Sequence, residues 1–538
     1  MTRADGSTAY DAVLIGGGHN GLVCAFYLAR AGLKVRVCER RAVVGGAAVT
    51  EEFHPGFRNS AASYTVSLLN PRIIADMRLA DYGLRMLKRP IANFLPTEDG
   101  RFLKVGGGLA RTQREVAKFS ARDAEALPRY YARLEAVADV LRRLALETPP
   151  NPRRRLRAGL AAARQLWPVA AGPLSLMEDV LDLFAKSARA FLDGWFESDP
   201  VKAVFGFDAV VGNYASPDAP GSAYVLLHHV FGEATGEKGA WGHAVGGMGA
   251  ITEAMRRACL DAGVEISLEA PVKSLIVENG AARGVVLESG EEVAAVRVVA
   301  NVNPKLLYTR MIEPGALPDD FRRRMANWRC ASGTFRMNVA LSELPNFSCL
   351  PGAGEHHQAG IILAPSLDYM DWAFLDAKRF GWSRRPIVEM LIPSTIDDTL
   401  APEGAHVASL FCQHFAPEPP NGRSWAEARE EAADAVIDAV DAWAPNFKKS
   451  VIARTILSPA DLEEKFGLVG GDIFHGALSI DQLWAARPAL GYGDYRGPLA
   501  GLYLCGSGAH PGGGVSGLPG RNAAGEILCD AGRGPRPG

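Results

Sequence analysis

Cysteine is scarce in this chain, which holds eight cysteines among 538 residues. They are scattered, and no two of them form a C-x-x-C pair or have the spacing of a metal-ligand set. Disulfide oxidoreductase chemistry needs a redox-active cysteine pair, so the sequence excludes it. Scattered cysteines without pairing also fit a reducing compartment.

Long apolar runs and a strong net charge are absent as well. No stretch of about eighteen uninterrupted apolar residues appears, so the sequence predicts no membrane span. Residues 1–9 carry no apolar segment of the kind found in secretory signals. A formal net charge of -2 produces no field that would attract nucleic acid. We expect a cytoplasmic protein, or a mitochondrial-matrix protein if the source is eukaryotic, with no nucleic-acid partner.

Glycine, in contrast, is concentrated near the N-terminus in the stretch "DAVLIGGGHNGLVCAFYLAR". The apolar residues 13–15 predict a buried strand, and residues 22–31 predict a helix. Gly16, Gly18 and Gly21 occupy the G-x-G-x-x-G positions between them. These glycines allow a tight turn, a close approach of phosphate to the backbone, and packing of the helix on the strand. The stretch therefore predicts a dinucleotide whose pyrophosphate lies at the helix N-terminus.

An acidic residue follows the second predicted strand, residues 35–38. Glu39 stands at the position where a carboxylate accepts hydrogen bonds from ribose hydroxyls. An acid at this position favours a ribose without a 2′-phosphate.

The choice between NAD and FAD depends on two further glycine-rich segments. Gly45 and Gly46 follow shortly after the ribose acid, where many flavoproteins bring the backbone against FAD. The C-terminal stretch "GLYLCGSGAHPGGGVSGLPGRNAAGEILCD" predicts a strand, a glycine-rich loop and a helix. A helix N-terminus near residues 515–517 would direct free N–H groups at the O2/N1 edge of a flavin. Together these segments predict FAD.

Several motifs resemble those of bacterial-type phytoene desaturases and carotenoid oxidoreductases. They are "GGGHNGL", "AVGGMGAITEAMRRACLDAGVEI" with "VRVVANVNP", and "LYLCGSGAHPGGGVSG", and the resemblance runs from about residue 11 to residue 530. It implies an α/β protein with a glutathione-reductase-like FAD-binding Rossmann domain interleaved with an α+β substrate domain. It also implies a noncovalent FAD and the oxidation, reduction or isomerisation of a hydrophobic substrate. The chain departs from the pattern at Ala47, where relatives often have arginine, and at Ser507, where they often have an acid.

The expected domains alternate along the chain. We expect the FAD-binding domain to comprise residues 1–108, 245–310 and 495–538, and the substrate or cap domain to comprise residues 109–244 and 311–494.

The resemblance places Val272 near the adenosine part of FAD and Asn301 near the same cofactor. The expected cofactor-binding residues are Gly16, Gly18, His19, Asn20, Gly21, Glu39, Arg40, Gly45, Gly46, Ala47, Val272, Asn301, Gly506, Ser507, Gly514, Val515 and Gly517.

Histidines supply the other candidates for chemistry. His510 precedes the flavin-side glycines and is a weak catalytic candidate, with a structural loop role as the alternative. The neighbouring pairs His228 with His229 and His356 with His357 lack the acids that would complete a metal site, so we expect no metal.

One set of residues and one segment allow both a functional and a purely structural interpretation. Gln413, His414 and Trp484 either line the substrate cavity or pack elsewhere in the fold. Residues 153–167 combine arginines with apolar residues, which fits peripheral membrane contact or a basic turn before a cap helix.

The predicted activity is that of an FAD-dependent dehydrogenase or desaturase. A hydrophobic, polyene or lipid-like substrate would transfer hydride to flavin N5, and oxygen or a quinone-like acceptor would reoxidise the flavin. The glycines at 106–108 lack a dinucleotide-binding context, so we expect no second nucleotide domain. The alternatives are a flavin-dependent isomerase or saturase, an amine oxidase, and a flavin-bound interaction protein with little turnover. The substrate, the catalytic base and the oligomeric state stay open.

Overall fold

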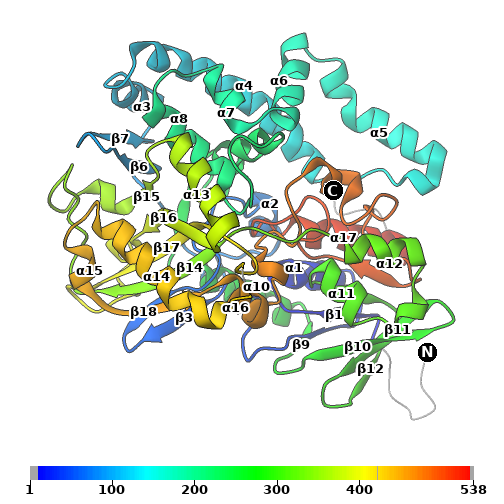
Figure 1. The fold of residues 1–538 in the computed structure, drawn as a ribbon. Helices are drawn as coiled ribbons and strands as arrows, with labels where there is room; N and C mark the ends of the chain where they lie inside the picture. Colours follow the sequence, from blue (N-terminus) through cyan, green and yellow to red (C-terminus); the bar gives the residue numbers. More distant parts are fainter. Residues whose placement is uncertain (1–9, 421, 534–538) are drawn as a thin grey trace.

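The computed structural model describes residues 10–420 and 422–533 and is centred on two sheets, with helices packed around them (Figure 1). A five-stranded parallel sheet has the order β19-β13-β1-β2-β9. Its strands are β1 (Ala12–Ile15), β2 (Val35–Cys38), β9 (Glu265–Ser267), β13 (Val298–Ala300) and β19 (Leu502–Leu504). The complete burial of β1, β13 and β19 is typical of a parallel sheet covered on both faces.

Helices α1 (His19–Arg30), α10 (Met248–Asp261) and α17 (Leu518–Asp530) pack beside this sheet (Figure 1). Gly520 allows α1 and α17 to approach closely, since a Cβ there would lie 2.1 Å from the Asn20 carbonyl oxygen. Both ends of the chain thus contribute to one layer.

An antiparallel excursion separates β9 from β13. It consists of β10 (Val272–Glu278), β11 (Ala281–Leu287) and β12 (Glu292–Ala294).

The second sheet has seven strands in the order β18-β14-β17-β16-β15-β6-β7. Their bounds are β6 (Asn93–Pro96), β7 (Phe102–Val105), β14 (Phe335–Leu341), β15 (Gly360–Leu363), β16 (Trp382–Leu391), β17 (His406–Phe415) and β18 (Val451–Leu457). Strand β6 pairs with β15, so residues 93–105 lie in the seven-stranded sheet. The expected FAD-binding segment 1–108 implied instead that they lie beside the parallel sheet. The alternation of a strand does not reveal which distant strand will accept its hydrogen bonds.

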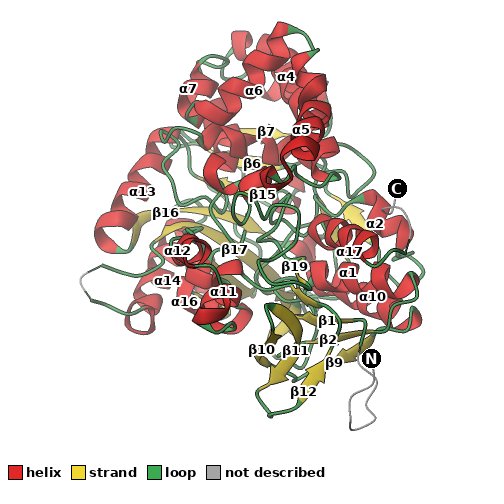
Figure 2. Ribbon diagram, turned by 90° about the vertical axis from the view of Figure 1, so that its right-hand side faces the viewer, coloured by secondary structure: helices red, strands yellow, loops and turns green. Residues whose placement is uncertain are grey.

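A helical cap lies beyond the β6–β7 edge (Figure 2). Its helices are α3 (Leu109–Val116), α4 (Ala121–Ala145), α5 (Arg155–Ala170), α6 (Leu174–Ala185), α7 (Ala188–Asp193), α8 (Asp199–Gly206) and α9 (His228–Phe231). The cap shares a hydrophobic core with one face of the seven-stranded sheet, and Tyr130, Phe196 and Phe205 pack together in it.

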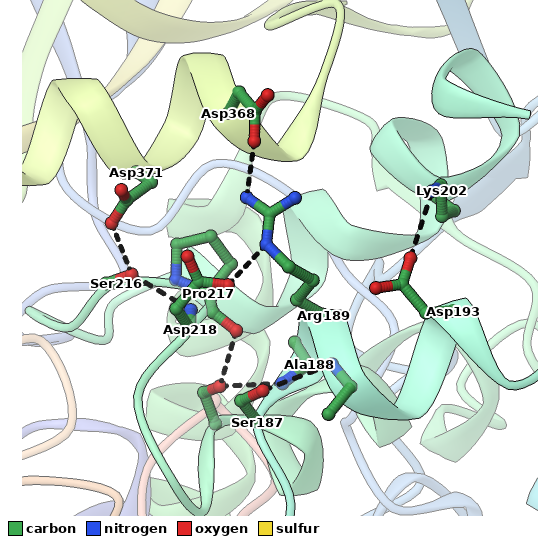
Figure 3. A network of polar contacts seen from close by, with 12 residues as sticks. Ser187, Ala188, Arg189, Asp193, Lys202, Ser216, Pro217, Asp218, Asp368 and Asp371 are labelled. Atoms are coloured by element: carbon green, nitrogen blue, oxygen red, sulfur yellow. Dashed lines mark hydrogen bonds and ion pairs between the residues drawn. The ribbon is translucent and has the colours of Figure 1, made fainter.

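Polar contacts join the cap to helix α13 (Leu367–Phe380), which packs on the seven-stranded sheet (Figure 3). The Arg189 guanidinium pairs with Asp218 and, at 2.8 Å, with Asp368 of α13. The Ser216 hydroxyl donates to Asp371 at 2.6 Å. These contacts hold the cap against the sheet.

Shorter elements complete the fold. They are β3 (Thr50–His54), β4 (Phe57–Ser60), β5 (Met86–Lys88), β8 (Gly242–Ala244), α2 (Pro71–Asp76), α11 (Pro304–Arg310), α12 (Asp319–Ala326), α14 (Trp425–Asp441), α15 (Phe447–Ser450) and α16 (Pro459–Phe466). Within the described residues, no helix is both long enough and apolar enough to cross a bilayer.

Candidate cofactor and substrate site

A cavity of about 540 Å³ extends from the carboxyl ends of the parallel strands to the seven-stranded sheet. Ligands of open α/β sheets bind in this place. The expected residues that line it are Gly16, Gly18, His19, Asn20, Glu39, Arg40, Gly45, Gly46, Ala47, Val272, Asn301, Ser507, Gly514 and Val515. Gly21, Gly506 and Gly517 lie outside the lining.

The N-terminal glycines form a cradle that a side chain would fill. A Cβ on Gly18 would lie 2.9 Å from the Asn301 amide nitrogen, and a Cβ on Gly21 would lie 2.4 Å from the Gly16 carbonyl oxygen. Asn301 in turn donates to that carbonyl oxygen at 3.2 Å. Helix α1 begins at His19, so its first N–H groups lie at the cavity. These residues fit a pyrophosphate.

Glu39 lies at the carboxyl end of β2 with both carboxylate oxygens held by the backbone. One oxygen accepts from the Gly17 N–H at 2.7 Å, and the other accepts from the Arg41 N–H at 2.9 Å. Each oxygen keeps a lone pair for a further donor, so the carboxylate fits a ribose hydroxyl.

The C-terminal loop forms the opposite end of the cradle. Gly514, Val515 and Ser507 line the cavity, and Gly517 caps the N-terminus of α17. The Asn20 amide donates to the Ser507 hydroxyl at 3.2 Å, which joins this loop to the N-terminal motif.

His510 points away from the cavity. The Nε2 atom of His510 lies 2.9 Å from the Leu144 carbonyl oxygen at the end of α4. The carbonyl oxygen of His510 accepts a hydrogen bond from the Tyr495 hydroxyl at 3.0 Å. Burial lowers the pKa of His510 to about 4. The structure therefore gives this side chain contacts with the cap rather than with the cavity.

His475 lines the cavity, and the sequence reasoning missed it. Its Nδ1 and the Nε2 of His19 have no hydrogen-bond partner within the part of the chain that the structure describes. Burial lowers the pKa of His475 to about 3 and that of His19 to about 4. Both are uncharged at neutral pH in the ligand-free protein. His475 lies in the irregular stretch "DIFHG", where local periodicity gives no signal.

Aromatic residues form the cavity wall near the seven-stranded sheet. Tyr64 stacks on Phe411 with ring centroids 5.1 Å apart, and its hydroxyl donates to Glu389 at 2.5 Å. Phe474 lines the same cavity and also a second, apolar cavity of about 140 Å³ beneath the cap. None of these residues stood in the sequence-based list.

Gln413, His414 and Trp484 do not line the cavity. Gln413 and His414 are fully buried, and their side-chain polar atoms have no hydrogen-bond partner among the described residues.

Metal and thiol chemistry find no support in the described ranges. No group of three or more His, Cys, Asp or Glu there could hold a metal ion, and the side chains of His228 and His229 lie outside the description. Burial raises the pKa of the Cys24 thiol, which contacts Cys505 away from the cavity lining.

Comparisons with known proteins agree with this geometry. Residues 21–334 match the family described as flavin containing amine oxidoreductase. Pyridine nucleotide-disulfide oxidoreductase domain-containing protein 2 of Rattus norvegicus is 43% identical, covering 97% of this chain and 94% of that protein. Phytoene desaturase (lycopene-forming) of Pseudescherichia vulneris is 25% identical, covering 94% of this chain and 96% of that protein. The expected resemblance is confirmed, as a distant relationship to the desaturase.

A solved oxidoreductase from Methanosarcina mazei has the same fold, with a TM-score of 0.62 at 16% identity, covering 97% of this chain and 99% of the other. The expected α/β architecture is thereby confirmed. Because the family match spans more than half of the sequence, the chain belongs to the flavin containing amine oxidoreductase family and is an FAD-dependent oxidoreductase.

Proposed function

We propose that this protein is a dehydrogenase or desaturase that oxidises a hydrophobic, polyene- or lipid-like substrate. When bound, FAD supplies the acceptor for the hydride that leaves the substrate, and a proton leaves the substrate separately. Oxygen or a quinone-like molecule would be the final electron acceptor.

The apolar wall beyond the cofactor cradle carries this proposal. Leu68, Val211, Trp241, Phe411 and Phe474 line the cavity between the glycine-rich loops and the seven-stranded sheet. Such a wall excludes water and orients an apolar molecule, which are the contributions that a protein makes to hydride transfer.

The cradle residues hold the cofactor without a covalent bond. The α1 N-terminus with Gly16 and Gly18 would hold the pyrophosphate, Glu39 would accept from the adenosine ribose, and Val272 would lie against the adenosine. Gly514 and Val515, in the loop before α17, line the cavity and would lie against the flavin.

Two uncharged imidazoles complete the site. His19 and His475 each present a partly exposed side chain to the cavity, with one ring nitrogen unpartnered among the described residues. We assign them hydrogen-bonding roles toward the bound molecules rather than a fixed positive charge.

Amine oxidation is the second candidate, favoured by the description of the matching family. The two candidates differ in the charge of the substrate, because a primary amine carries a proton at neutral pH.

Peripheral membrane contact through α5 and α6 fits a lipid-like substrate. Leu156, Leu160, Trp167, Leu174 and Leu181 are all largely exposed on these two helices. Of the four arginines in the expected basic cluster, the structure describes the side chain of Arg153 alone. The guanidinium of Arg153 lies 4.0 Å from the Tyr492 ring centroid, and the other three arginine side chains lie outside the described part.

Anaerobic titration tests the proposed function. The oxidised holoprotein would be mixed with a panel of polyenes, terpenes, long-chain lipids and amines, while the flavin absorbance near 450 nm is followed. We expect bleaching by at least one apolar compound and none by simple amines. Bleaching by amines alone, with peroxide released on admitting oxygen, would favour the second candidate.

A further inference from the structure

A row of side chains crosses the seven-stranded sheet at the substrate end of the cavity. Glu389 of β16 lies opposite Phe411 of β17, and Phe411 lies opposite Arg336 of β14. Directly paired residues on antiparallel strands share one face of a sheet. Because Phe411 lines the cavity, Glu389 and Arg336 belong to the face that backs its wall.

Tyr64 covers this row from the cavity side. Its ring stacks on Phe411, its hydroxyl donates to Glu389, and the Arg336 guanidinium lies 4.5 Å from its ring centroid. Burial and the neighbouring Glu389 raise the pKa of Tyr64 well above its usual range, so the phenol stays neutral.

Arg336 is incompletely paired although it is only 1% exposed. Its Nη2 donates to the Ser409 hydroxyl at 2.7 Å, while Nε and Nη1 have no hydrogen-bond partner in residues 10–420 and 422–533. A buried cationic donor without an acceptor costs free energy, so such a group calls for an oxygen from water or from a ligand.

The cluster carries a net positive charge. Arg89 donates to the Thr65 hydroxyl, and Thr65 lines the cavity. Burial lowers the pKa of Arg336 to about 10, so Arg336 remains charged at neutral pH. Two guanidinium groups face one carboxyl group, Glu389, so the sum is positive whether or not Glu389 is ionised.

We propose that this cluster selects the substrate by charge, so that the cavity takes an apolar molecule ending in a carboxylate and rejects an ammonium. This inference rests on the proposed function and names the class of its substrate. The carboxylate offsets the positive charge of the cluster, whereas an ammonium meets a like charge behind a wall of low dielectric. Charge selection acts across the Tyr64 ring, since such fields extend beyond direct contact.

Binding of three matched probes tests the proposal without any turnover. Decanoate, decanol and decylamine share one chain and differ in the charge of the end group. Each would be titrated into the oxidised holoprotein at pH 7.5 under argon, with calorimetry and the flavin difference spectrum as readouts. We expect decanoate to bind at least about tenfold more tightly than decanol, and decylamine to bind most weakly. Decylamine binding as tightly as decanoate would overturn the proposal.

Two variants locate the effect. Arg336→Gln removes the buried charge and should bring the dissociation constants of decanoate and decanol to within about threefold of each other. Arg89→Gln provides a second test at a residue outside the sheet row and should reduce the same preference. The control is Arg385→Gln, whose guanidinium also lies over a tyrosine ring, 4.9 Å from the Tyr369 centroid, but is largely exposed. An unchanged preference in both cluster variants would also refute the assignment.

The same experiment separates this inference from the proposed function. Tight, charge-selective binding of decanoate alongside no bleaching by any apolar compound would leave the selection standing and refute the dehydrogenase proposal. Bleaching by uncharged apolar compounds without any preference for decanoate would support the dehydrogenase proposal and refute the charge selection.

Discussion

Gly18 shows how one missing side chain makes room for a cofactor. Its φ of -67° is allowed for any residue, so the glycine is needed for space and not for backbone conformation. We expect Gly18→Ala to fold normally and to lose about tenfold or more of its FAD occupancy, because the added Cβ would lie 2.9 Å from the Asn301 amide nitrogen and displace a side chain that lines the cavity. The ratio of flavin to protein absorbance after purification measures this.

The matched control for Gly18 is Gly159→Ala in α5, where an added Cβ meets nothing within 4 Å. This variant should load FAD as the wild type does. Equal FAD occupancy in both variants would contradict the assignment of the cradle. After acid precipitation, yellow colour retained in the pellet would contradict noncovalent binding.

Arg487 holds two cavity loops together from a fully buried position. Its guanidinium donates to the carbonyl oxygens of Ser507 at 2.8 Å, of Phe474 at 2.5 Å and of Gln482 at 3.1 Å. Lysine cannot reproduce this planar fork, so Arg487→Lys should lower the free energy of unfolding by about 3 kcal/mol. Urea denaturation measures the loss.

Arg329→Lys provides the comparison for Arg487, because Arg329 is exposed and pairs with Asp481 on the surface. It should change stability by no more than about 0.5 kcal/mol. If the two variants had equal free energies of unfolding, the buried Arg487 guanidinium would contribute no more to stability than a surface ion pair.

Asp397 makes the stability of the protein sensitive to acid. Burial would raise the pKa of this carboxyl group, but hydrogen bonds from His243 at 2.7 Å, from Thr399 and from the Gly246 N–H outweigh it and lower the pKa. A carboxyl group with a lowered folded-state pKa stabilises the fold above its unfolded pKa, and this contribution is lost as the pH falls.

We therefore expect the free energy of unfolding to fall between about pH 5 and pH 3, and to fall less steeply in Asp397→Asn, with a difference of about 2 kcal/mol. Asp398→Asn, at the exposed neighbouring position, is the control and should follow the wild type. Parallel pH profiles for wild type and Asp397→Asn would show that this carboxylate is not responsible.

At the scale of single elements, α5 and α6 expose more large apolar side chains than the other cap helices do. Leu156 is 87% exposed and Leu181 is 67% exposed. We expect the protein to co-sediment with anionic vesicles, and Leu160→Glu combined with Leu174→Glu to reduce this binding about tenfold, because charged side chains resist burial at the acyl boundary. Sedimentation at fixed lipid concentration measures the bound fraction.

Leu375→Glu on α13, another exposed apolar position, is the control for vesicle binding. It should leave binding unchanged. Neutralising the four arginines at 153, 154, 155 and 157 tests the electrostatic part separately. Equal binding by all variants would place the membrane contact elsewhere.

Elements close to one another in sequence agree best with the expectations. The predicted strands at residues 13–15 and 35–38 appear as β1 and β2, and the predicted helix at residues 22–31 appears as α1. Their periodicity and their glycine stops act within one turn or one strand. The cap helices between residues 109 and 240 follow for the same reason.

At the scale of the whole molecule, the source of electrons follows from what the fold contains. The glycines at 106–108 join β7, an antiparallel edge strand, to α3 and so do not form a second dinucleotide-binding unit. We expect neither NADH nor NADPH to bleach the flavin at a rate compatible with turnover in anaerobic stopped-flow mixing, while the organic substrate should. Fast bleaching by either nucleotide would instead favour a saturase-type reductase.

The sequence by itself determined the cofactor end of the site. Gly16, Gly18 and Glu39 belong to one β-α-β unit, and the glycine-rich loop before α17 carries a recognisable pattern of its own. The structure brings these segments to one cavity because parallel strands present their carboxyl ends at the same edge of the sheet.

Only the tertiary structure decided the substrate end. Tyr64, Arg336, Glu389 and Phe411 come from four separate segments, and the pairing register of β14, β16 and β17 brings them together. Packing likewise turned His510 toward α4 and His475 toward the cavity. The physical reason is that side-chain direction and strand partners depend on contacts between residues far apart in the chain, which local periodicity does not encode.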